Sequence, residues 1–243
     1  MALGLGVNHS LTDYALGWEP TDSEPIGTAI LFLKNNTNVS VSAWLDEISN
    51  TGDFTQSTST RQATVAEGGL DFDGVDNYYA RNNLLSIAAD IPSAIVFVFS
   101  PSGSLGSPEG IFGSTEASNA SSISIANVDN SPDEDSSIVR FTANGQTTSF
   151  TFSNIITTTI QYIIILKTGG GALTAYHNQH GNAEVDNSPN ENVFNIRDIG
   201  FGSSSYFQGI LHEAFIISDI PSAGYETELI KDYLNYKFNL TAA

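Results

Sequence analysis

Apolar and polar side chains alternate over many short stretches of this chain, most clearly just before Gly74. Leu70 and Phe72 fall on one face of a strand, because successive side chains of a β-strand point to opposite sides. Asp71 and Asp73 fall on the other face. A glycine among acidic and amide residues is typical of a tight turn. The pattern therefore predicts a half-buried strand that ends in a turn at the surface.

Similar runs recur along the rest of the chain. Residues 94–99 (AIVFVF) are apolar throughout, which indicates a central strand covered on both faces. Asn144-Gly145 favours a type I′ hairpin, and residues 168–171 (TGGG) predict a second hairpin. The other predicted strands cover residues 28–34, 39–45, 122–125, 138–141, 149–152, 161–166, 172–176, 194–201 and 210–217. This succession predicts an all-β fold, an antiparallel β-sandwich or jelly roll.

One short helix is predicted at the C-terminal end, over residues 222–238. Ser222 suits the N-cap position, acidic residues occupy the early turns and lysines the later ones, as the helix dipole favours. An apolar stripe recurs at helical spacing and comprises Tyr225, Leu229, Tyr233 and Tyr236. We expect this helix to lie against the flank of the sandwich.

The first residues follow a different pattern. Residues 1–27 mix Gly, Pro, Asp and Glu with scattered apolar residues and show no sustained period. We expect an N-terminal arm over residues 1–27 and one jelly-roll domain over residues 28–243. The arm packs on a neighbouring molecule or on the flank of its own domain, or it is a simple tail, and the sequence leaves these alternatives open.

Composition restricts the classes of partner. The 243 residues, 40% of them hydrophobic, suffice for one all-β domain. Asp and Glu outnumber Lys and Arg by 27 to 8, and the net charge of -19 repels nucleic acid and anionic membranes, so we expect neither as a partner. No stretch approaches the roughly 18 to 20 apolar residues of a membrane span. The chain has no cysteine, which excludes disulfides, thiolate metal sites and a cysteine nucleophile.

Three segments together carry a resemblance to a known fold family. They are residues 44–50 (WLDEISN), 70–78 (LDFDGVDNY) and 206–217 (YFQGILHEAFII). In this order, and with the closing helix, they resemble concanavalin A-like, laminin-G-like jelly-roll domains over roughly residues 28–240. That family has a tryptophan-acid-serine-glycine loop, a Phe-Asp-Gly-x-Asp-Asp turn and a Phe-x-Gly-x-Ile-x-Glu strand. The sequence departs from it at residues 50–52 and at Asn77, which replaces the second acid of the turn.

Enzymatic chemistry is not indicated. Some concanavalin A-like proteins resemble laminarinase-type glucanases, and glycoside hydrolysis needs two carboxyls about 5 to 9 Å apart. The Glu-x-Asp-x-x-Glu or Glu-x-Asp-x-Glu strand of those enzymes does not occur here, and the nearest acidic groups, residues 133–135 and 184–186, are typical of solvated loops. His177 and His180 lie in a polar stretch without an apparent third metal ligand, and a surface loop is the preferred interpretation. We expect no enzyme and predict no catalytic residue.

The turn around Gly74 is a candidate metal site. Asp71, Asp73 and Asp76 place three carboxylates around it, and hard oxygen ligands of this kind suit Ca²⁺. A purely structural turn is the preferred interpretation. A structural calcium ion is the alternative, and no other cofactor is expected.

Carbohydrate binding is the remaining role that the resemblance implies, through aromatic faces and amide side chains. The candidates are Tyr78, Tyr79, Trp44 and Asn77. Trp44 lies in an alternating stretch, which favours a core position over a binding role. For the two tyrosines the sequence does not decide.

The expected biological setting follows from a mismatch between the fold and the start of the sequence. Jelly rolls of this type usually work outside cells, yet the chain begins at Met1 without a secretory signal. The sequence is also similar to laminin-G-like structural proteins of tailed phages, especially marine ones. We therefore expect a virion protein made in the host cytoplasm, a head-decoration or fibre/appendage subunit that is oligomeric in the particle. Its arm would contact other virion proteins, and its sandwich would face cell-surface glycans. The alternative is a free carbohydrate-binding adhesin or lectin-like module.

Overall fold

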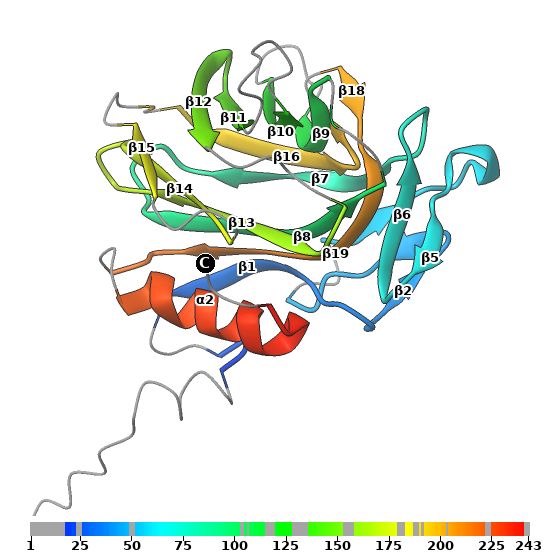
Figure 1. The fold of residues 1–243 in the computed structure, drawn as a ribbon, viewed down its shortest axis with the longest axis horizontal. Coiled ribbons are helices and arrows are strands. Elements are labelled where there is room, and N and C mark those ends of the chain that lie inside the picture. The colour runs from blue at the N-terminus through cyan, green and yellow to red at the C-terminus, as the bar shows by residue number, and fades with distance from the viewer. Residues whose placement is uncertain are drawn as a thin grey trace, which may run out of the picture.

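Two antiparallel β-sheets packed face to face make up the body of the protein (Figure 1). The computed structural model describes residues 18–22, 26–48, 52–102, 105, 107–114, 120–127, 136–152, 158–178, 183–186, 190, 192–202, 204–221 and 225–240. Within these ranges one α-helix, α2 (Tyr225–Phe238), covers the outer face of one sheet. The predicted antiparallel β-sandwich with a single C-terminal helix is confirmed.

The sheet that carries the helix, sheet A, has eight strands in the described part of the chain. They are β1 (Thr28–Leu33), β5 (Thr64–Ala66), β6 (Gly69–Asp73), β8 (Ser93–Pro101), β13 (Gln161–Lys167), β14 (Leu173–His177), β15 (Glu184–Asp186) and β19 (Gln208–Ser218). Their order is β15-β14-β13-β8-β19-β6-β5, and β1 also pairs with β19. The first and last strands of the body are therefore neighbours.

Sheet B has nine strands in the same ranges. They are β2 (Val39–Ser40), β3 (Ala43–Trp44), β4 (Phe54–Thr55), β7 (Tyr79–Ile87), β9 (Glu109–Ser114), β10 (Ser121–Asn127), β11 (Ser137–Ala143), β12 (Gln146–Phe152) and β16 (Phe194–Ile199). Their order is β12-β11-β10-β9-β16-β7-β4-β3-β2. A separate small hairpin joins β17 (Phe201–Gly202) to β18 (Ser205–Tyr206), and a 3-10 turn, η1, spans Ser59–Arg61.

The strand β8 is central, as its apolar run predicts. It pairs with β13 on one side and β19 on the other. Phe97 and Phe99 face the core between the sheets, whereas Val96 and Val98 face the cluster under α2. Since both faces are covered, nearly every position is apolar.

The hairpin between β11 and β12 has the predicted turn. Asn144 and Gly145 both have positive φ, 47° and 82°, which a type I′ turn requires. Ala143 pairs with Gln146 across it. The strands β13 and β14 likewise flank residues 168–171.

Residues 39–45 do not form the single extended strand that their alternation predicts. They form a tight hairpin, β2 and β3, with Val39 paired with Trp44. The Ser40 hydroxyl accepts a hydrogen bond from the Ala43 amide at 3.1 Å. Short polar side chains compete in this way with regular strand pairing, and here the competition closes a turn.

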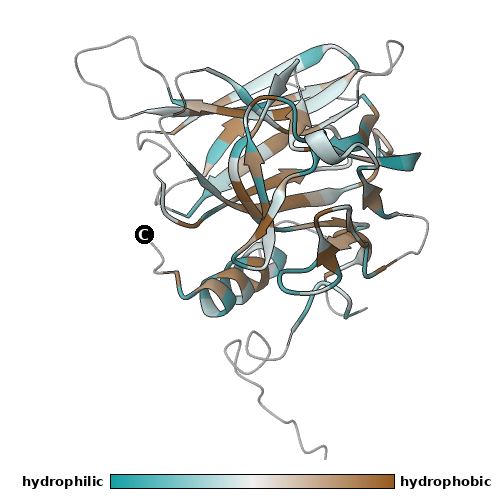
Figure 2. Cartoon of the chain, turned by 90° about the vertical axis from the view of Figure 1, so that its right-hand side faces the viewer, coloured by the Kyte–Doolittle hydropathy of each residue, from teal (hydrophilic) through white to brown (hydrophobic). Residues whose placement is uncertain are grey.

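Two apolar clusters hold the body together, and Figure 2 shows the apolar stretches on the strands of the interior. The larger cluster fills the space between the sheets and includes Trp44, Phe72 and Phe97. The second lies between sheet A and α2 and includes Phe215 and Leu229. Burying large side chains of this kind is the main driving force for folding.

The helix buries a face displaced from the predicted stripe. Leu229 and Tyr233 are buried as expected, but Tyr236 is 66% exposed, and Ile230 and Leu234 are buried instead. With about 100° between successive helical residues, the buried arc runs from Leu229 through Tyr233 and Ile230 to Leu234, and Tyr236 falls just beyond its Leu229 margin. The side chain of Tyr225 lies outside the described residues.

A buried ionic cluster, here called the helix anchor, fixes α2 on sheet A. The Glu213 carboxylate on β19 is fully buried and accepts hydrogen bonds from the Tyr233 hydroxyl at 2.7 Å and from the backbone N–H of Asn35 at 3.0 Å. The Lys237 ammonium group donates to the same carboxylate. Burial and the neighbouring Glu213 carboxylate raise the pKa of Tyr233, so its hydroxyl keeps the proton that it donates.

Part of the predicted arm packs on the flank of its own domain. Trp18 and Ile26 are buried in the cluster under α2, and the Trp18 ring meets the Tyr233 ring edge to face at 5.4 Å. Residues 1–17 and 23–25 of the arm lie outside the described residues.

Candidate functional site

A pocket of about 320 Å³ opens on the face of sheet B that points away from sheet A. It is lined by Arg61, Tyr78, Ala80, Arg197, Asp198, Phe201 and Tyr206. Ala80 on β7 pairs with Asp198 on β16, and their neighbours Tyr79 and Ile199 are buried in the inter-sheet core. Because side chains alternate along a strand, Ala80 and Asp198 point to the opposite, outer face.

An irregularity in the sheet shapes the floor of this pocket. The register between β16 and β7 shifts between Ile196 and Asp198, at the position of Arg197. A bulge of this kind bends a strand and redirects a side chain. Arg197 lines the pocket and is partly exposed, whereas Asp198 is only 4% exposed.

Three aromatic rings line the pocket and remain partly exposed. Phe201 and Tyr206 are a cross-strand pair of the β17–β18 hairpin, with ring centroids 4.8 Å apart. Tyr78 completes the group, at 6.1 Å from Phe201 and 6.4 Å from Tyr206. The Ser205 hydroxyl donates to the Gly202 carbonyl at 3.0 Å and closes the hairpin turn, which fixes the two rings side by side.

The turn before β7 positions Tyr78. The Asp73 carboxylate accepts hydrogen bonds from the amides of Val75 at 2.9 Å and of Asp76 and Asn77, both at 3.3 Å. Asn77 Oδ1 accepts in return from the Asp73 amide at 3.0 Å. Gly74 has a φ of 75°, which other residues rarely adopt. The turn is therefore closed by its own side chains.

Arg61 at the end of η1 reaches the pocket from the other side. Its guanidinium carbon lies 6.0 Å from the centre of the Tyr78 ring, within the range of a cation–π contact. Its Nε atom lies 3.9 Å from the Asp76 carboxylate. At this separation the two charged groups attract each other but form no hydrogen bond.

Of the four predicted carbohydrate-binding residues, the structure places only Tyr78 in the pocket. Trp44 is fully buried in the core, and its Nε1 donates to the Lys34 carbonyl at 3.3 Å, so its ring cannot stack on a sugar. Tyr79 is also fully buried, and its hydroxyl donates to the Val41 carbonyl at 2.8 Å. Burial raises the pKa of Tyr79 to about 12. Asn77 is only 6% exposed and belongs to the turn.

The three candidate calcium ligands do not converge. Asp73 is directed at the amides of its own turn, and Asp76 lies beside Arg61. Burial and the nearby Glu67 raise the pKa of Asp71. Among the residues that the structure describes, no group of three or more His, Asp or Glu side chains could hold a metal ion. The calcium site remains a prediction, and the turn has a sufficient explanation without it.

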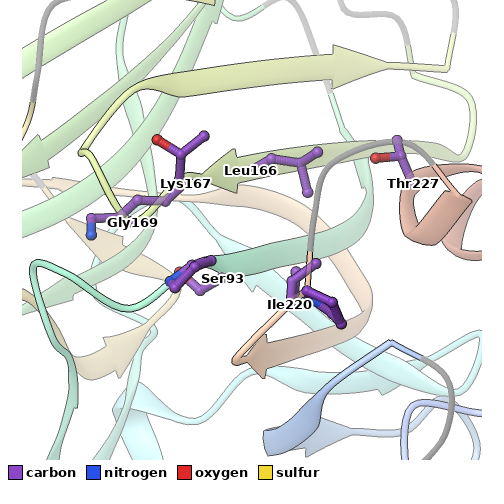
Figure 3. Close-up of a pocket in the computed structure, with 9 residues that line it drawn as sticks. Ser93, Leu166, Lys167, Gly169, Ile220 and Thr227 are labelled. Atoms are coloured by element: carbon purple, nitrogen blue, oxygen red, sulfur yellow. The ribbon is translucent and has the colours of Figure 1, made fainter.

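A second pocket, of about 260 Å³, lies at the opposite side of the body, between the ends of β8 and β13 and the start of α2 (Figure 3). Its lining includes Leu166, Ile220 and Thr227 and contains no carboxylate. Lys167 also lines it, but its ammonium group donates to the carbonyls of Ala88 and Ala89. This pocket offers an aliphatic wall and no paired acid and base.

The other residues considered for chemistry have structural surroundings. Glu184 and Asp186 belong to the edge strand β15 and not to a loop as predicted, because they pair with β14. His177 is likewise not in a surface loop: it is buried on β14, with Nε2 2.6 Å from Gln161 Oε1. Residues 133–135 and His180 lie outside the described residues. No helix of the described part is both long and apolar enough to cross a membrane.

Comparison with known proteins supports the fold. No protein-family model matches the chain, and no curated protein matches its sequence. Solved structures do match. The receptor-binding domain of botulinum neurotoxin D matches with a TM-score of 0.56 at 17% identity, over 84% of this chain and 52% of that chain. Domain 4 of AbnA, an extracellular arabinanase from Geobacillus stearothermophilus solved with arabinotriose, matches with a TM-score of 0.53 at 14% identity. This match covers 84% of this chain and 99% of the AbnA domain.

A third match is the Trypanosoma rangeli sialidase, with a TM-score of 0.57 at 11% identity, over 88% of this chain and 33% of that chain. The chain thus spans about half of the neurotoxin chain, a third of the sialidase chain and nearly all of the AbnA domain. At these identities the likeness shows a shared β-sandwich fold. The comparisons leave the binding site to be argued from the residues of this chain.

Proposed function

We propose that this chain is a carbohydrate-binding β-sandwich without catalytic activity, and that the saccharide lies on the rings of Tyr78, Phe201 and Tyr206. The observation that carries the proposal is the partial exposure of these three rings around one pocket. The large aromatic side chains of the core are almost completely buried by comparison. Keeping three rings at a surface forgoes the free energy of burial, and a ligand that stacks on them recovers it.

The polar groups of the pocket suit a saccharide as well. Sugar rings present an apolar face edged by hydroxyl groups, so a binding site needs flat rings together with a few oriented polar groups. Arg61, Arg197 and Asp198 supply donors and an acceptor around the rings. The volume of about 320 Å³ falls at the lower end of the range for small-molecule sites.

The pocket favours binding over hydrolysis. Glycosidases of the usual kind flank the scissile bond with two carboxyls. The described residues of the lining include one carboxyl, Asp198, which is 4% exposed. Fold similarity to a domain that was solved with arabinotriose supports the proposal by analogy of scaffold only.

A glycan array probed with the purified chain tests the proposal, followed by calorimetric titration of the best ligand. Tyr206→Ala should weaken binding about fivefold, because an aromatic contact contributes on the order of 1 kcal/mol. Tyr236→Ala is the matched control, since Tyr236 is exposed on α2 at the opposite side of the body. An array without any bound saccharide, or equal losses in the two variants, would refute the proposal.

The proposal extends to the setting: the chain is a structural protein of a tailed-phage particle, and other virion proteins hold it through its N-terminal residues. The phage resemblance of the sequence and its acidic, cysteine-free composition support this part. Mass spectrometry of purified particles tests it, and absence of the chain from the particles would favour the free adhesin. Removing residues 1–17, which spares the buried Trp18, should abolish incorporation while the body still folds.

A further inference from the structure

Arginine is scarce in this chain, and its distribution is uneven. The sequence contains 21 asparagines but only four arginines, against 27 acidic residues. Two of the four, Arg61 and Arg197, line the aromatic pocket. Amide side chains, which serve neutral hydroxyl groups well, are abundant elsewhere in the sequence, and none occurs among the described residues that line the pocket. The pocket therefore concentrates a residue type that binds anions.

The two remaining arginines have other surroundings. Arg81 is 6% exposed, lies 5.6 Å from the Phe54 ring and is attracted by the Asp46 carboxylate, while burial lowers its pKa. Arg140 lies on β11, where it pairs across the sheet with Ser149. Neither contributes to the lining of the pocket.

The charges of the pocket are layered. The Arg61 side chain is 49% exposed and Arg197 is partly exposed, whereas Asp198 is 4% exposed. A ligand entering from solvent therefore meets the guanidinium groups before the carboxylate. Asp76 is the acidic neighbour of Arg61, and its distance of 3.9 Å leaves the guanidinium hydrogen-bonding groups unengaged by this contact.

We infer that the pocket selects acidic saccharides, with a carboxylate or sulfate group of the sugar bound by Arg61 and Arg197 and the ring stacked on the aromatic group. This inference rests on the proposed function and narrows its ligand class. A guanidinium matches the two oxygens of a carboxylate or sulfate with parallel hydrogen bonds. The net charge of -19 opposes the approach of any anion, so affinity for an acidic sugar has to come from such local contacts.

Matched pairs of charged and neutral ligands test whether the pocket binds an anionic group of the sugar, and whether that group is a carboxylate or a sulfate. A galacturonate oligosaccharide is titrated against the same oligosaccharide with its carboxylates methyl-esterified, so that the ring stays and the charge goes. The acid should bind at least about tenfold more tightly, because a charge-assisted pair contributes more than a neutral one. A sulfated galactan oligosaccharide and its desulfated form make the corresponding pair for sulfate. Preference within one pair only identifies the source of the anion.

Variants assign the effect to the two arginines. Arg61→Gln and Arg197→Gln should each weaken binding of the acidic oligosaccharide about tenfold and leave the neutral partner unchanged, whereas Arg140→Gln should change neither. Raising the salt concentration from about 0.1 to about 1 M should weaken only the acidic ligand, because screening shortens the range of the attraction. Arg61 is exposed, so its variant should keep the melting temperature of the parent even if Arg197→Gln disturbs the bulge.

The outcomes separate the two proposals. Equal affinity for the charged and neutral members of both pairs, or an array that retains only neutral glycans, overturns the inference and leaves carbohydrate binding intact. In that case Arg61 serves only Tyr78 and Asp76. An array without any bound saccharide, acidic or neutral, defeats the proposed function and this inference together.

Discussion

The helix anchor and the aromatic pocket use the same three kinds of side chain for different ends. In the anchor, Lys237, Tyr233 and Glu213 meet under α2, and the carboxylate is fully buried and bonded to three donors. At the edge of the pocket, Arg61, Tyr78 and Asp76 also bring a cation, a tyrosine and a carboxylate together, but the ionic groups lie 3.9 Å apart and all three side chains are partly exposed. Because the helix anchor is buried and fully hydrogen-bonded, it serves as a structural element. The group at the pocket is neither buried nor fully hydrogen-bonded, so it stays accessible to a ligand.

Removing the buried carboxylate should have the largest effect. Glu213→Ala leaves the Lys237 ammonium and the Asn35 amide without their partner, so we expect the free energy of unfolding to fall by about 3 kcal/mol or more. Denaturant unfolding followed by circular dichroism measures it. Glu228→Ala on the same helix is the control, because its ion pair with Lys231 is exposed and contributes about 0.5 kcal/mol. Similar losses in both variants would contradict the distinction between buried and exposed clusters.

A buried carboxyl without a neighbouring cation should stabilise the folded state at low pH, whereas an ion-paired carboxyl stabilises it at high pH. Burial raises the pKa of Glu109 on β9 to about 7, although the Gln208 amide donates to it at 2.9 Å. A raised folded-state pKa means that the folded protein holds this proton more tightly than the unfolded chain. Stability from this group should be complete below about pH 4.5 and should decline as the pH rises to about 7, by about 1 to 3 kcal/mol.

Unfolding experiments across this pH range, on the parent and on Glu109→Gln, measure the decline. The glutamine keeps an acceptor for the Gln208 amide but cannot ionise. The difference between the two proteins should therefore vary between about pH 4.5 and 7 and stay constant outside it. A difference that is independent of pH would show that Glu109 titrates normally.

The turn that positions Tyr78 should couple a small loss of stability to a loss of binding. Asp73→Ala removes the acceptor of three turn amides, which should cost about 1 kcal/mol and weaken saccharide binding by displacing Tyr78 and Asp76. Asp73→Asn keeps an acceptor oxygen and should therefore retain most of the stability and most of the saccharide affinity. If binding is unchanged in the alanine variant, the turn does not position the pocket.

Calcium should have the smallest effect. Because side chains and amides already satisfy the turn, Ca²⁺ added to chelator-treated protein should produce neither binding heat nor a rise in melting temperature. A rise of several degrees that Asp73→Asn abolishes would instead establish the metal site at Asp71, Asp73 and Asp76.

Much of the fold follows from periodicity. The strand at Leu70 and Phe72, the apolar run of β8 and the Asn144-Gly145 hairpin each express one local rule, and each appears as predicted. The prediction for residues 39–45 was wrong because the alternation of a short segment does not reveal that a serine side chain closes a turn within it. The end of the helix at Phe238 is as predicted, whereas the predicted N-cap, Ser222, lies outside the described residues. The buried face of the helix depends on where sheet A meets it.

The pocket was harder to predict, because segments far apart in the sequence build it. Arg61, Tyr78 and residues 197–206 come together only through the pairing of β7 with β16 and the hairpin that follows. Alternation alone implies that adjacent residues such as Tyr78 and Tyr79 face opposite ways, so one of them had to be buried. The signal missed was the pair Phe201 and Tyr206 on either side of a run of small polar residues.

The two ends of the described chain lie on the same side of the body. Trp18 and Leu240 both join the apolar cluster beneath α2, outside sheet A, while the aromatic pocket opens outside sheet B. The thickness of the whole sandwich lies between them. A scaffold, a neighbouring subunit or a bead on a sensor surface that holds the body at Trp18 or Leu240 will therefore lie across the sandwich from the aromatic pocket.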